Sequence, residues 1–335
     1  MSDFRPPSGF EEALRPPVDV RRARLTRAVL GRMRGAGPSE AAAQFERVAR
    51  RVPEVMVKIT GRTRDGAHLG AHLAYISRNG ALALEGPDGE RLDRAGVRDL
   101  ADEWAAELAM EPRGRRDAPV SLSVVLSMPA GTDAGRLHDA ARAFGSEVFG
   151  DRFPYVFALH DEGRHPHVHL TVRMLGRDGE RLNPRKADLQ LWRERFAQAL
   201  RERSVEAEAT PRRARGVTRK AERTSVRKLR ERFEAGDGPA PRILRDAVRD
   251  AASDEGGAEP WKAALRARRD RILRALSAEA VRLGLSRDKD GRRKAETVVD
   301  FVKALPPVET RRDVIRRRLE LSERERPPPG GGRSR

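Results

Sequence analysis

Residues 158–173, ALHDEGRHPHVHLTVR, hold four of the chain's seven histidines and decide how the surrounding sequence folds. The β-prone run FPYVFALH (153–160) is followed by the short turn DEGR and then by HPHVHLTVRML (165–175). This composition and spacing predict a β-hairpin. Alternation along its second strand places one polar set of side chains on a shared face: His165, His167, His169, Thr171 and Arg173. The apolar side chains between them are expected to enter the core.

The spacing of the histidines favours one set of metal ligands. Neighbouring same-face positions lie ~7 Å apart along a strand, so two imidazoles there can converge on one ion with bonds of ~2.1 Å. His165 and His169 lie ~13 Å apart, which makes a ligand set that uses both of them awkward. His160 ends the first strand across the short turn and supplies a better third ligand. The predicted metal ligands are therefore His160, His167 and His169, and His165 is left beside the ion or in contact with a phosphate.

The turn of the hairpin adds two acids next to the predicted metal site. An all-histidine site with an open position suits a divalent ion that polarises oxygens. Asp161 and Glu162 could orient a ligand imidazole through its second nitrogen. Each acid taken singly is about equally well explained as a solvated turn residue.

The residues on both sides of the hairpin predict an α+β domain over 52–217. Runs 54–60 and 118–129 are β-prone, whereas 65–80, 95–111, 132–150 and 186–209 have helical periodicity, and 176–184 reads as a turn leading to a short strand. Because the strands come in hairpins, we expect a central antiparallel sheet with helices on one face, followed by an α-helical C-terminal region.

The flanking segments have different compositions. Residues 1–51 are expected to form a basic, partly disordered N-terminal extension that includes short Arg-rich helices. Residues 218–325 carry Arg-rich helical stretches without β-prone runs, and 326–335 form a low-complexity tail that we expect to be disordered. The linker residues Arg212 and Arg213 are candidate DNA contacts.

Overall charge points to a polyanionic partner. The chain has 335 residues, 69 Lys and Arg against 51 Asp and Glu, and a formal net charge of +18. Aromatic residues make up only 4%, so nucleic-acid binding is expected to depend on phosphate contacts. The chain contains no cysteine, which excludes disulfides and thiolate metal sites. No apolar run approaches the ~20 residues that span a bilayer, and the N-terminus does not resemble a secretory signal, so we expect a cytoplasmic protein without membrane insertion.

One of the two tyrosines is a candidate nucleophile. Tyr155 lies in an apolar strand run and is expected in the core. Tyr75 shares a predicted helix face with His68 and His72, and Arg78 follows one turn later. A phenol can attack phosphorus when a metal neutralises the charge of the phosphate and the phenol's proton, with a reference pKa of ~10, has an acceptor. Beside a histidine-bound metal, Tyr75 therefore indicates single-strand nicking by transesterification, with Arg78 or Arg173 on the phosphate.

Three segments resemble one family. HPHVHLTVR (165–173) resembles the third motif of the His-hydrophobic-His endonucleases. HLAYISRNG (72–80) with LDRAGVRDLADEW (92–104) resembles the N-terminal region of conjugative relaxases of the T-DNA border endonuclease branch and related mobilisation proteins. The segment 182–216 resembles the region after the histidine motif in that family. The resemblance covers about residues 54–217.

The resemblance implies a palm-like sheet and a specific activity. It assigns the nucleophile to Tyr75 and a Mg²⁺ or Mn²⁺ ion to His160, His167 and His169. The enzyme would nick single-stranded DNA at an origin of transfer, keep the 5′ end on its tyrosine, pass with the strand through a type IV secretion channel, and reseal it in the recipient. The implied partners are an accessory DNA-binding mobilisation protein and a type IV coupling protein.

The sequence departs from the family pattern at two positions. Glu162 stands where an aspartate is common, so its role as orienter or proton acceptor is an expectation only. Ser204 stands where a helix often ends in glycine. A rolling-circle replication initiator or transposase of the same endonuclease group remains an alternative, as does a non-catalytic DNA-binding accessory protein.

Overall fold

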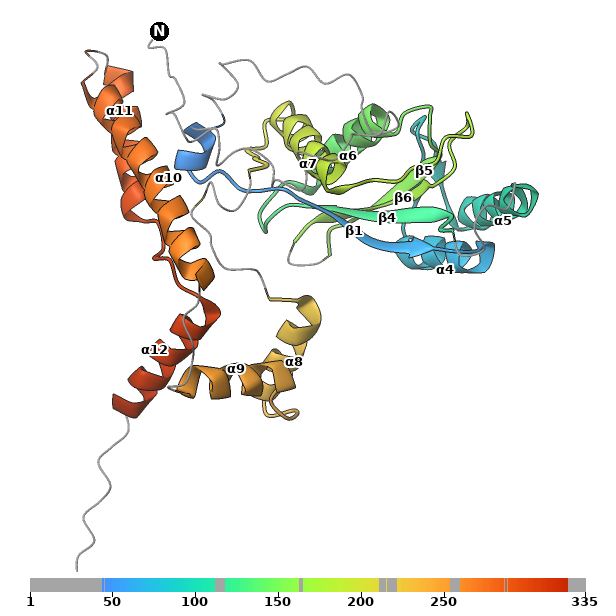
Figure 1. Ribbon diagram of the computed structural model, residues 1–335. Helices are drawn as coiled ribbons and strands as arrows, with labels where there is room; N and C mark the ends of the chain where they lie inside the picture. The colour runs from blue at the N-terminus through green and yellow to red at the C-terminus, as the bar shows by residue number, and fades with distance from the viewer. Residues whose placement is uncertain are drawn as a thin grey trace, which may run out of the picture. The chain divides into compact units, whose positions relative to one another are not determined.

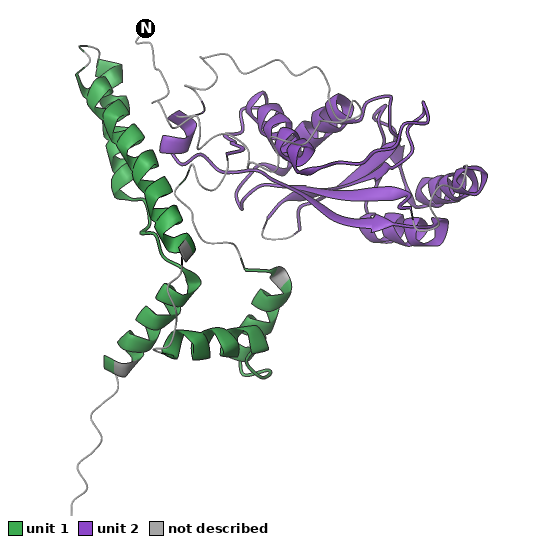
Figure 2. Ribbon diagram, in the orientation of Figure 1, with its two compact units in different colours: residues 1–14, 212–335 green, residues 15–211 purple. Residues whose placement is uncertain are grey.

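The computed structural model of the chain describes residues 44, 46–111, 118–162, 165–210, 215, 222–253, 260–285, 287 and 289–324. They fall into two compact units, which are residues 15–211 and residues 212–335 together with 1–14 (Figure 2). Arg212 and Arg213 lie outside the described residues. Among the described helices, none combines the length and apolar character required to span a bilayer.

The larger unit is built on a six-stranded antiparallel sheet with the order β1-β4-β6-β5-β2-β3 (Figure 1). The strands are β1 (Met56–Thr63), β2 (Leu84–Glu85), β3 (Arg91–Leu92), β4 (Ser121–Ser127), β5 (Tyr155–His160) and β6 (His167–Arg173). The predicted hairpin is confirmed as β5 and β6, in which His160 lies opposite His167 and Ala158 opposite His169. The α+β class is confirmed.

Helices cover both faces of the sheet. α6 (Ala134–Val148) and α7 (Lys186–Arg201) pack on the face that carries Val168, Leu170 and Val172, and together they form the larger core. α4 (Gly66–Ile76) and α5 (Arg94–Met110) pack on the opposite face over Val156 and Ala158 (Figure 1). From the sequence we expected helices on one face only. That part of the expectation is wrong, because helical periodicity shows which side of a helix is buried but not the sheet face on which it packs.

Aspartate side chains begin three of these helices. Asp65, Asp93 and Asp133 each stand at an N-cap with extended backbone, and each side chain accepts a hydrogen bond from a backbone N–H in the first turn. This satisfies donors that the helix itself leaves unpaired, and such caps typically contribute ~1 kcal/mol each. The cap at Asp65 fixes where α4 begins, and α4 carries Tyr75 in its last turn.

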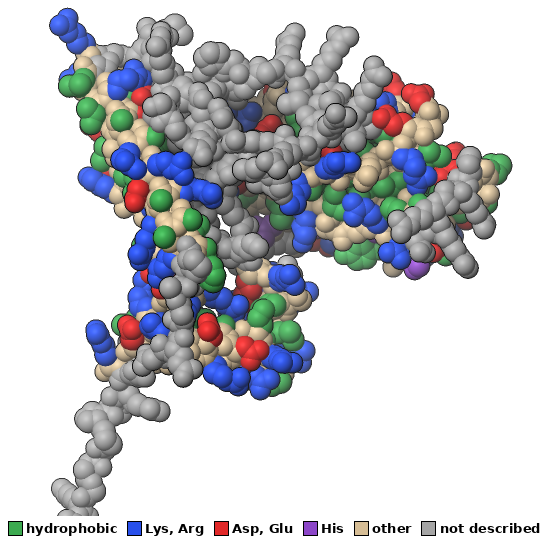
Figure 3. Space-filling model, viewed as in Figure 1, with side chains coloured by type: hydrophobic (Ala, Val, Ile, Leu, Met, Phe, Trp, Pro, Cys, Tyr) green, Lys and Arg blue, Asp and Glu red, His purple; other side chains and the backbone are tan. Residues whose placement is uncertain are grey.

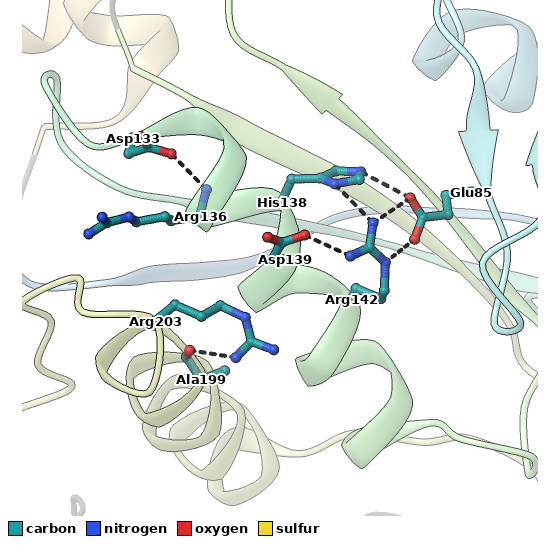
Figure 4. Close-up of polar contacts among 8 residues, drawn as sticks. All are labelled: Glu85, Asp133, Arg136, His138, Asp139, Arg142, Ala199 and Arg203. Atoms are coloured by element: carbon teal, nitrogen blue, oxygen red, sulfur yellow. Dashed lines mark hydrogen bonds and ion pairs between the residues drawn. The ribbon is translucent and has the colours of Figure 1, made fainter.

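The short strands β2 and β3 were not predicted from the sequence. Their hairpin is joined to α6 through a buried carboxylate, because Glu85 pairs with the guanidinium of Arg142 and with Nε2 of His138 at 3.2 Å (Figure 4). Arg142 in turn bonds Asp139 at 2.7 Å. Burial lowers the pKa of His138, although the nearby Glu85 opposes this effect. These pairs keep the charge of Glu85 compensated at the edge of the sheet.

Strand β1 forms one edge of the sheet and contains a bulge. It pairs with β4 from Met56 opposite Ser127 to Thr63 opposite Ser121, and the register shifts by one residue between Ile59 and Gly61. The bulge therefore leaves Thr60 without an opposite residue. Val57 is buried in the core beneath α7, so Met56 and Lys58 point to the opposite face, which carries the histidines.

The smaller unit consists of basic helices. Its elements are α8 (Thr224–Glu234), α9 (Arg242–Ala252), α10 (Pro260–Gly284), α11 (Lys289–Lys303) and α12 (Arg311–Arg324). α10 and α11 bury an apolar seam that includes Leu276, Leu283 and Phe301. Arg316 of α12 donates to the carbonyl of Ala251 at the end of α9, at 3.2 Å. Lys and Arg side chains are prominent along the face of this unit in Figure 3. A helical C-terminal region is thus confirmed.

Candidate metal centre

Three histidines converge at the end of the β5–β6 hairpin. One ring nitrogen from each of His160, His167 and His169 lies within 4.8 Å of the others. The ring centroids are 5.3 Å apart for His160 and His167, 4.6 Å for His160 and His169, and 5.0 Å for His167 and His169. The antiparallel register explains this cluster, because it sets His160 directly across from His167 on the shared face.

Two of the three rings are oriented by backbone carbonyls. Nε2 of His160 lies 2.7 Å from the carbonyl oxygen of Ile76, and Nδ1 of His167 lies 3.0 Å from that of His165. When these nitrogens carry the proton and donate it, Nδ1 of His160 and Nε2 of His167 keep their lone pairs for a ligand. Imidazoles held in this way are typical of metal sites.

Burial keeps two of these rings, His160 and His169, neutral. Desolvation, together with the neighbouring His160 and His167, lowers the pKa of His169 to about 4. Desolvation also lowers the pKa of His160, partly offset by its bond to Ile76. Metal binding requires neutral imidazole, so both groups are in the correct protonation state at pH 7 without a proton to remove. Three imidazole nitrogen donors fit a divalent ion, and the donor set does not by itself select which ion.

Tyr75 lies directly beside the histidine cluster. It occupies the last turn of α4, its side chain is 65% exposed, and its ring meets that of His169 edge-on at 5.9 Å. The next residue, Ile76, supplies the carbonyl that orients His160. The end of α4 therefore holds a candidate nucleophile and also contacts a candidate ligand.

His72 connects the body of α4 to the sheet. Its Nε2 lies 2.9 Å from Oγ of Ser123 on β4, and its ring stacks with that of Tyr75 at 6.3 Å. Burial lowers the pKa of His72, so the ring is neutral at pH 7. Ser123 was not predicted as a site residue from the sequence. The alternation of serines in SLSVVLS could have indicated it, because it places Ser121, Ser123 and Ser127 on the histidine face.

The segment after α4 brings two further predicted residues together. Arg78, Asn79 and Gly80 all have left-handed backbone, with φ of 50°, 56° and 83°. Arg78 forms an ion pair with Glu162, and both side chains are partly exposed. The structure therefore places these two residues in contact with each other at the rim of the site. Their predicted roles, a phosphate contact for Arg78 and a ligand orienter for Glu162, remain proposals.

The two remaining described DNA-contact candidates, His165 just before β6 and Arg173 at its end, differ in exposure. His165 is exposed beside the cluster. Arg173 is 2% exposed, and its guanidinium bonds Glu107 at 2.8 Å and Glu111 while lying 5.5 Å from the ring centroid of Trp104. Arg173 thus anchors α5 to the sheet, and its charge is already compensated. Its shared strand face with the histidines was predicted, but the acids that α5 brings over it were not.

Comparison with known proteins agrees with this geometry. Residues 75–205 match the family model described as the MobA/VirD2-like relaxase nuclease domain, a range that includes Tyr75 and all three clustered histidines. Residues 75–205 of the chain are therefore similar to the nuclease domain of the MobA/VirD2-like relaxases.

Three similar proteins are T-DNA border endonucleases. The T-DNA border endonuclease VirD2 of Rhizobium radiobacter is 26% identical over 202 residues, covering 54% of this chain and 47% of that protein. VirD2 of Agrobacterium fabrum is 27% identical, covering 55% and 47%, and VirD2 of Rhizobium rhizogenes is 28% identical, covering 36% and 30%. The chain thus spans about half or less of the length of the curated relatives that it matches.

Proposed function

We propose that this protein is a relaxase that nicks one DNA strand through Tyr75. The observation that carries the proposal is the exposed ring of Tyr75 lying edge-on to His169, at a cluster of three histidines. An exposed phenol beside a metal site suits attack on a phosphodiester. The relatives named as T-DNA border endonucleases support DNA as the substrate.

The proposed reaction is a transesterification. Oη of Tyr75 attacks the scissile phosphorus, the new Oη–P bond replaces the P–O3′ bond, and the departing strand takes a proton to become a free 3′-hydroxyl. The proton of the phenol leaves to water, to which the side chain of Tyr75 is open. A divalent ion, Mg²⁺ or Mn²⁺, would supply positive charge at the phosphate oxygens when held by His160, His167 and His169. The 5′-phosphotyrosine keeps the ester energy, so attack by a 3′-hydroxyl reseals the strand.

The biological setting is part of the same proposal. A covalent 5′ link that can be resealed suits the transfer of one strand from an origin of transfer on a plasmid or mobile element. An accessory DNA-binding mobilisation protein would then present the origin, and a type IV coupling protein would receive the linked strand. Glu162 and Arg78 would lie at the rim where the strand enters.

The test compares two tyrosine variants. Wild-type protein, Tyr75→Phe and Tyr155→Phe are incubated with Mn²⁺ and labelled single-stranded oligonucleotides from the element's origin region, and denaturing gels are examined for a covalent band. Tyr155 is buried and remote from the cluster, so Tyr155→Phe should form the adduct as wild type does. Tyr75→Phe should form none and should bind the oligonucleotide within about twofold of wild type, because a single phenol oxygen is lost. A 5′-linked adduct on Tyr75→Phe would refute the assignment.

A further inference from the structure

The register of the sheet extends the histidine face beyond the metal centre. Reading across the strands, Lys58 of β1 lies opposite Val125 of β4, which lies opposite His169 of β6. The adjacent row runs from Met56 through Ser127 to His167 and His160. Paired strands are ~5 Å apart, so the Cα atom of Lys58 is about 10 Å from that of His169 on the same face.

Lys58 is the charged residue of this surface. We call the eight positions of these two rows the β1–β6 floor: Met56, Lys58, Val125, Ser127, Ala158, His160, His167 and His169. All eight belong to the described residues, and Lys58 is the one among them with a permanent charge. Its side chain is exposed, and no ion pair or hydrogen bond of its ammonium occurs among the described residues.

The helices leave the β1 end of the floor open at Met56 and Lys58, whereas Val125 and Ser127 on β4 are buried. α4 lies over the neighbouring part of the sheet, where His72 bonds Ser123, and its last turn places Tyr75 against His169. Met56 is 46% exposed although it lies in a strand. An exposed thioether next to an ammonium offers an apolar contact for a base beside a charged contact for a phosphate.

We propose that the β1–β6 floor binds the single strand next to the scissile phosphate, with Lys58 holding a neighbouring phosphate. This inference rests on the proposed relaxase function and adds a second contact for the strand, at Lys58 on the edge strand β1. Lysine suits this role because its ammonium acts as a point charge on a flexible stem and can follow a backbone that is not held in a duplex. Lys58 positions the strand and takes no part in the chemistry at Tyr75.

The strand offers a matched control for this lysine. Arg62 is exposed on the same strand, but it pairs with Leu122, whose side chain is in the core beneath α6 and α7. Its side chain therefore points to the other face of the sheet. Lys58→Gln and Arg62→Gln each remove one positive charge from β1, and only the first removes it from the floor. Lys58→Arg keeps the charge in place.

The first measurement does not require nicking. In the Tyr75→Phe background, the affinity for a fluorescein-labelled oligo(dT) is measured across a series of salt concentrations. Lys58→Gln should weaken binding roughly five- to tenfold and reduce the slope of log affinity against log salt by about 0.7, the value for one phosphate on a single strand. Arg62→Gln should leave the slope unchanged, and Lys58→Arg should restore it.

The second measurement locates the phosphate. Single methylphosphonates are placed along an origin-derived strand, and each is combined with Lys58→Gln in a double-mutant cycle. One neutralised phosphate near the nick should cancel the effect of Lys58→Gln. Equal slope changes in the two glutamine variants, or no change in Lys58→Gln, would overturn the inference. Failure of this inference can be distinguished from failure of the proposed function. If wild-type protein forms no covalent adduct, the nicking assignment is wrong, but the salt dependence of binding still tests the role of Lys58.

Discussion

Backbone conformation at single residues shows where this chain differs from an ideal sequence for its fold. Ser204, just after α7, has φ of 57°, in the left-handed region that side chains with a Cβ rarely occupy. Its amide bonds the carbonyl of Arg201 at 3.0 Å, so the position reverses the chain at the end of the helix. Glycine is the residue that such a turn favours.

Replacement of Ser204 by glycine should stabilise the protein. The left-handed conformation costs an L-residue ~1–2 kcal/mol, whereas the extra freedom of glycine in the unfolded chain costs ~0.5–1 kcal/mol. We expect Ser204→Gly to raise the free energy of unfolding by roughly 1 kcal/mol in urea titrations. The control Ser146→Gly, at an exposed position inside α6, should lower it by about 0.5 kcal/mol. A lower stability for Ser204→Gly would contradict this account.

Residue type alone could not show the role of Arg173. Alternation correctly put it on the face that carries the histidines, and a free arginine there would meet a phosphate. The decisive partners, Glu107 and Glu111, come from a helix more than sixty residues earlier in the chain. Long-range pairing of this kind leaves no periodic signal, so the buried ion pairs became visible only in the folded structure.

At the scale of elements, the sequence predicted what depends on local pattern. The hairpin of β5 and β6 follows from period-two alternation around a short turn, and α4 to α7 follow from helical spacing. The strands β2 and β3 contain two residues each, too few for any alternation to be recognised. The sheet face that each helix covers depends on chain connections through space, which periodicity does not encode.

The hairpin should bind metal in the absence of DNA. Its register brings His160 opposite His167, so a ligand set from two strands is complete when the hairpin folds. Calorimetry with Mn²⁺ should detect one site in wild-type protein and a loss of affinity of at least about tenfold in His167→Ala. His68→Ala is the control, because that side chain is 73% exposed at the start of α4. Equal Mn²⁺ affinity in both variants would exclude the cluster as the site.

At the scale of the whole molecule, neutral histidines couple stability to pH. Burial lowers the pKa of His72, His138, His160 and His169, the last to about 4 from a usual value of 6.5. Between these values the unfolded chain binds more protons than the folded protein. The contribution of these histidines to stability therefore rises with pH. It is fully present above about pH 6.5 and is lost as the pH falls through the folded-state pKa values.

The free energy of unfolding should fall by roughly 2 kcal/mol between pH 7.5 and pH 5, with metal removed by a chelator. Burial raises the pKa of Asp188 and of Glu194, which acts in the opposite direction. The histidine contribution is therefore read from a comparison with His138→Gln, which removes one titrating ring away from the metal cluster. A smaller loss of stability in that variant is expected. Parallel pH profiles, or a stability that rises as the pH falls, would disprove the coupling.

The bulge in β1 has a consequence for how this edge strand can change in evolution. Thr60 is the one residue of β1 without an opposite residue on β4. A chain that lacks it can therefore pair Ile59 and Gly61 with consecutive residues of β4. Met56, Lys58 and Thr63 would then keep the faces they have now. A deletion elsewhere between Val57 and Thr63 would move the side chains on one side of it to the opposite face. The bulge is thus the one position in β1 where a residue can be deleted while Lys58 stays on the face that carries the histidines.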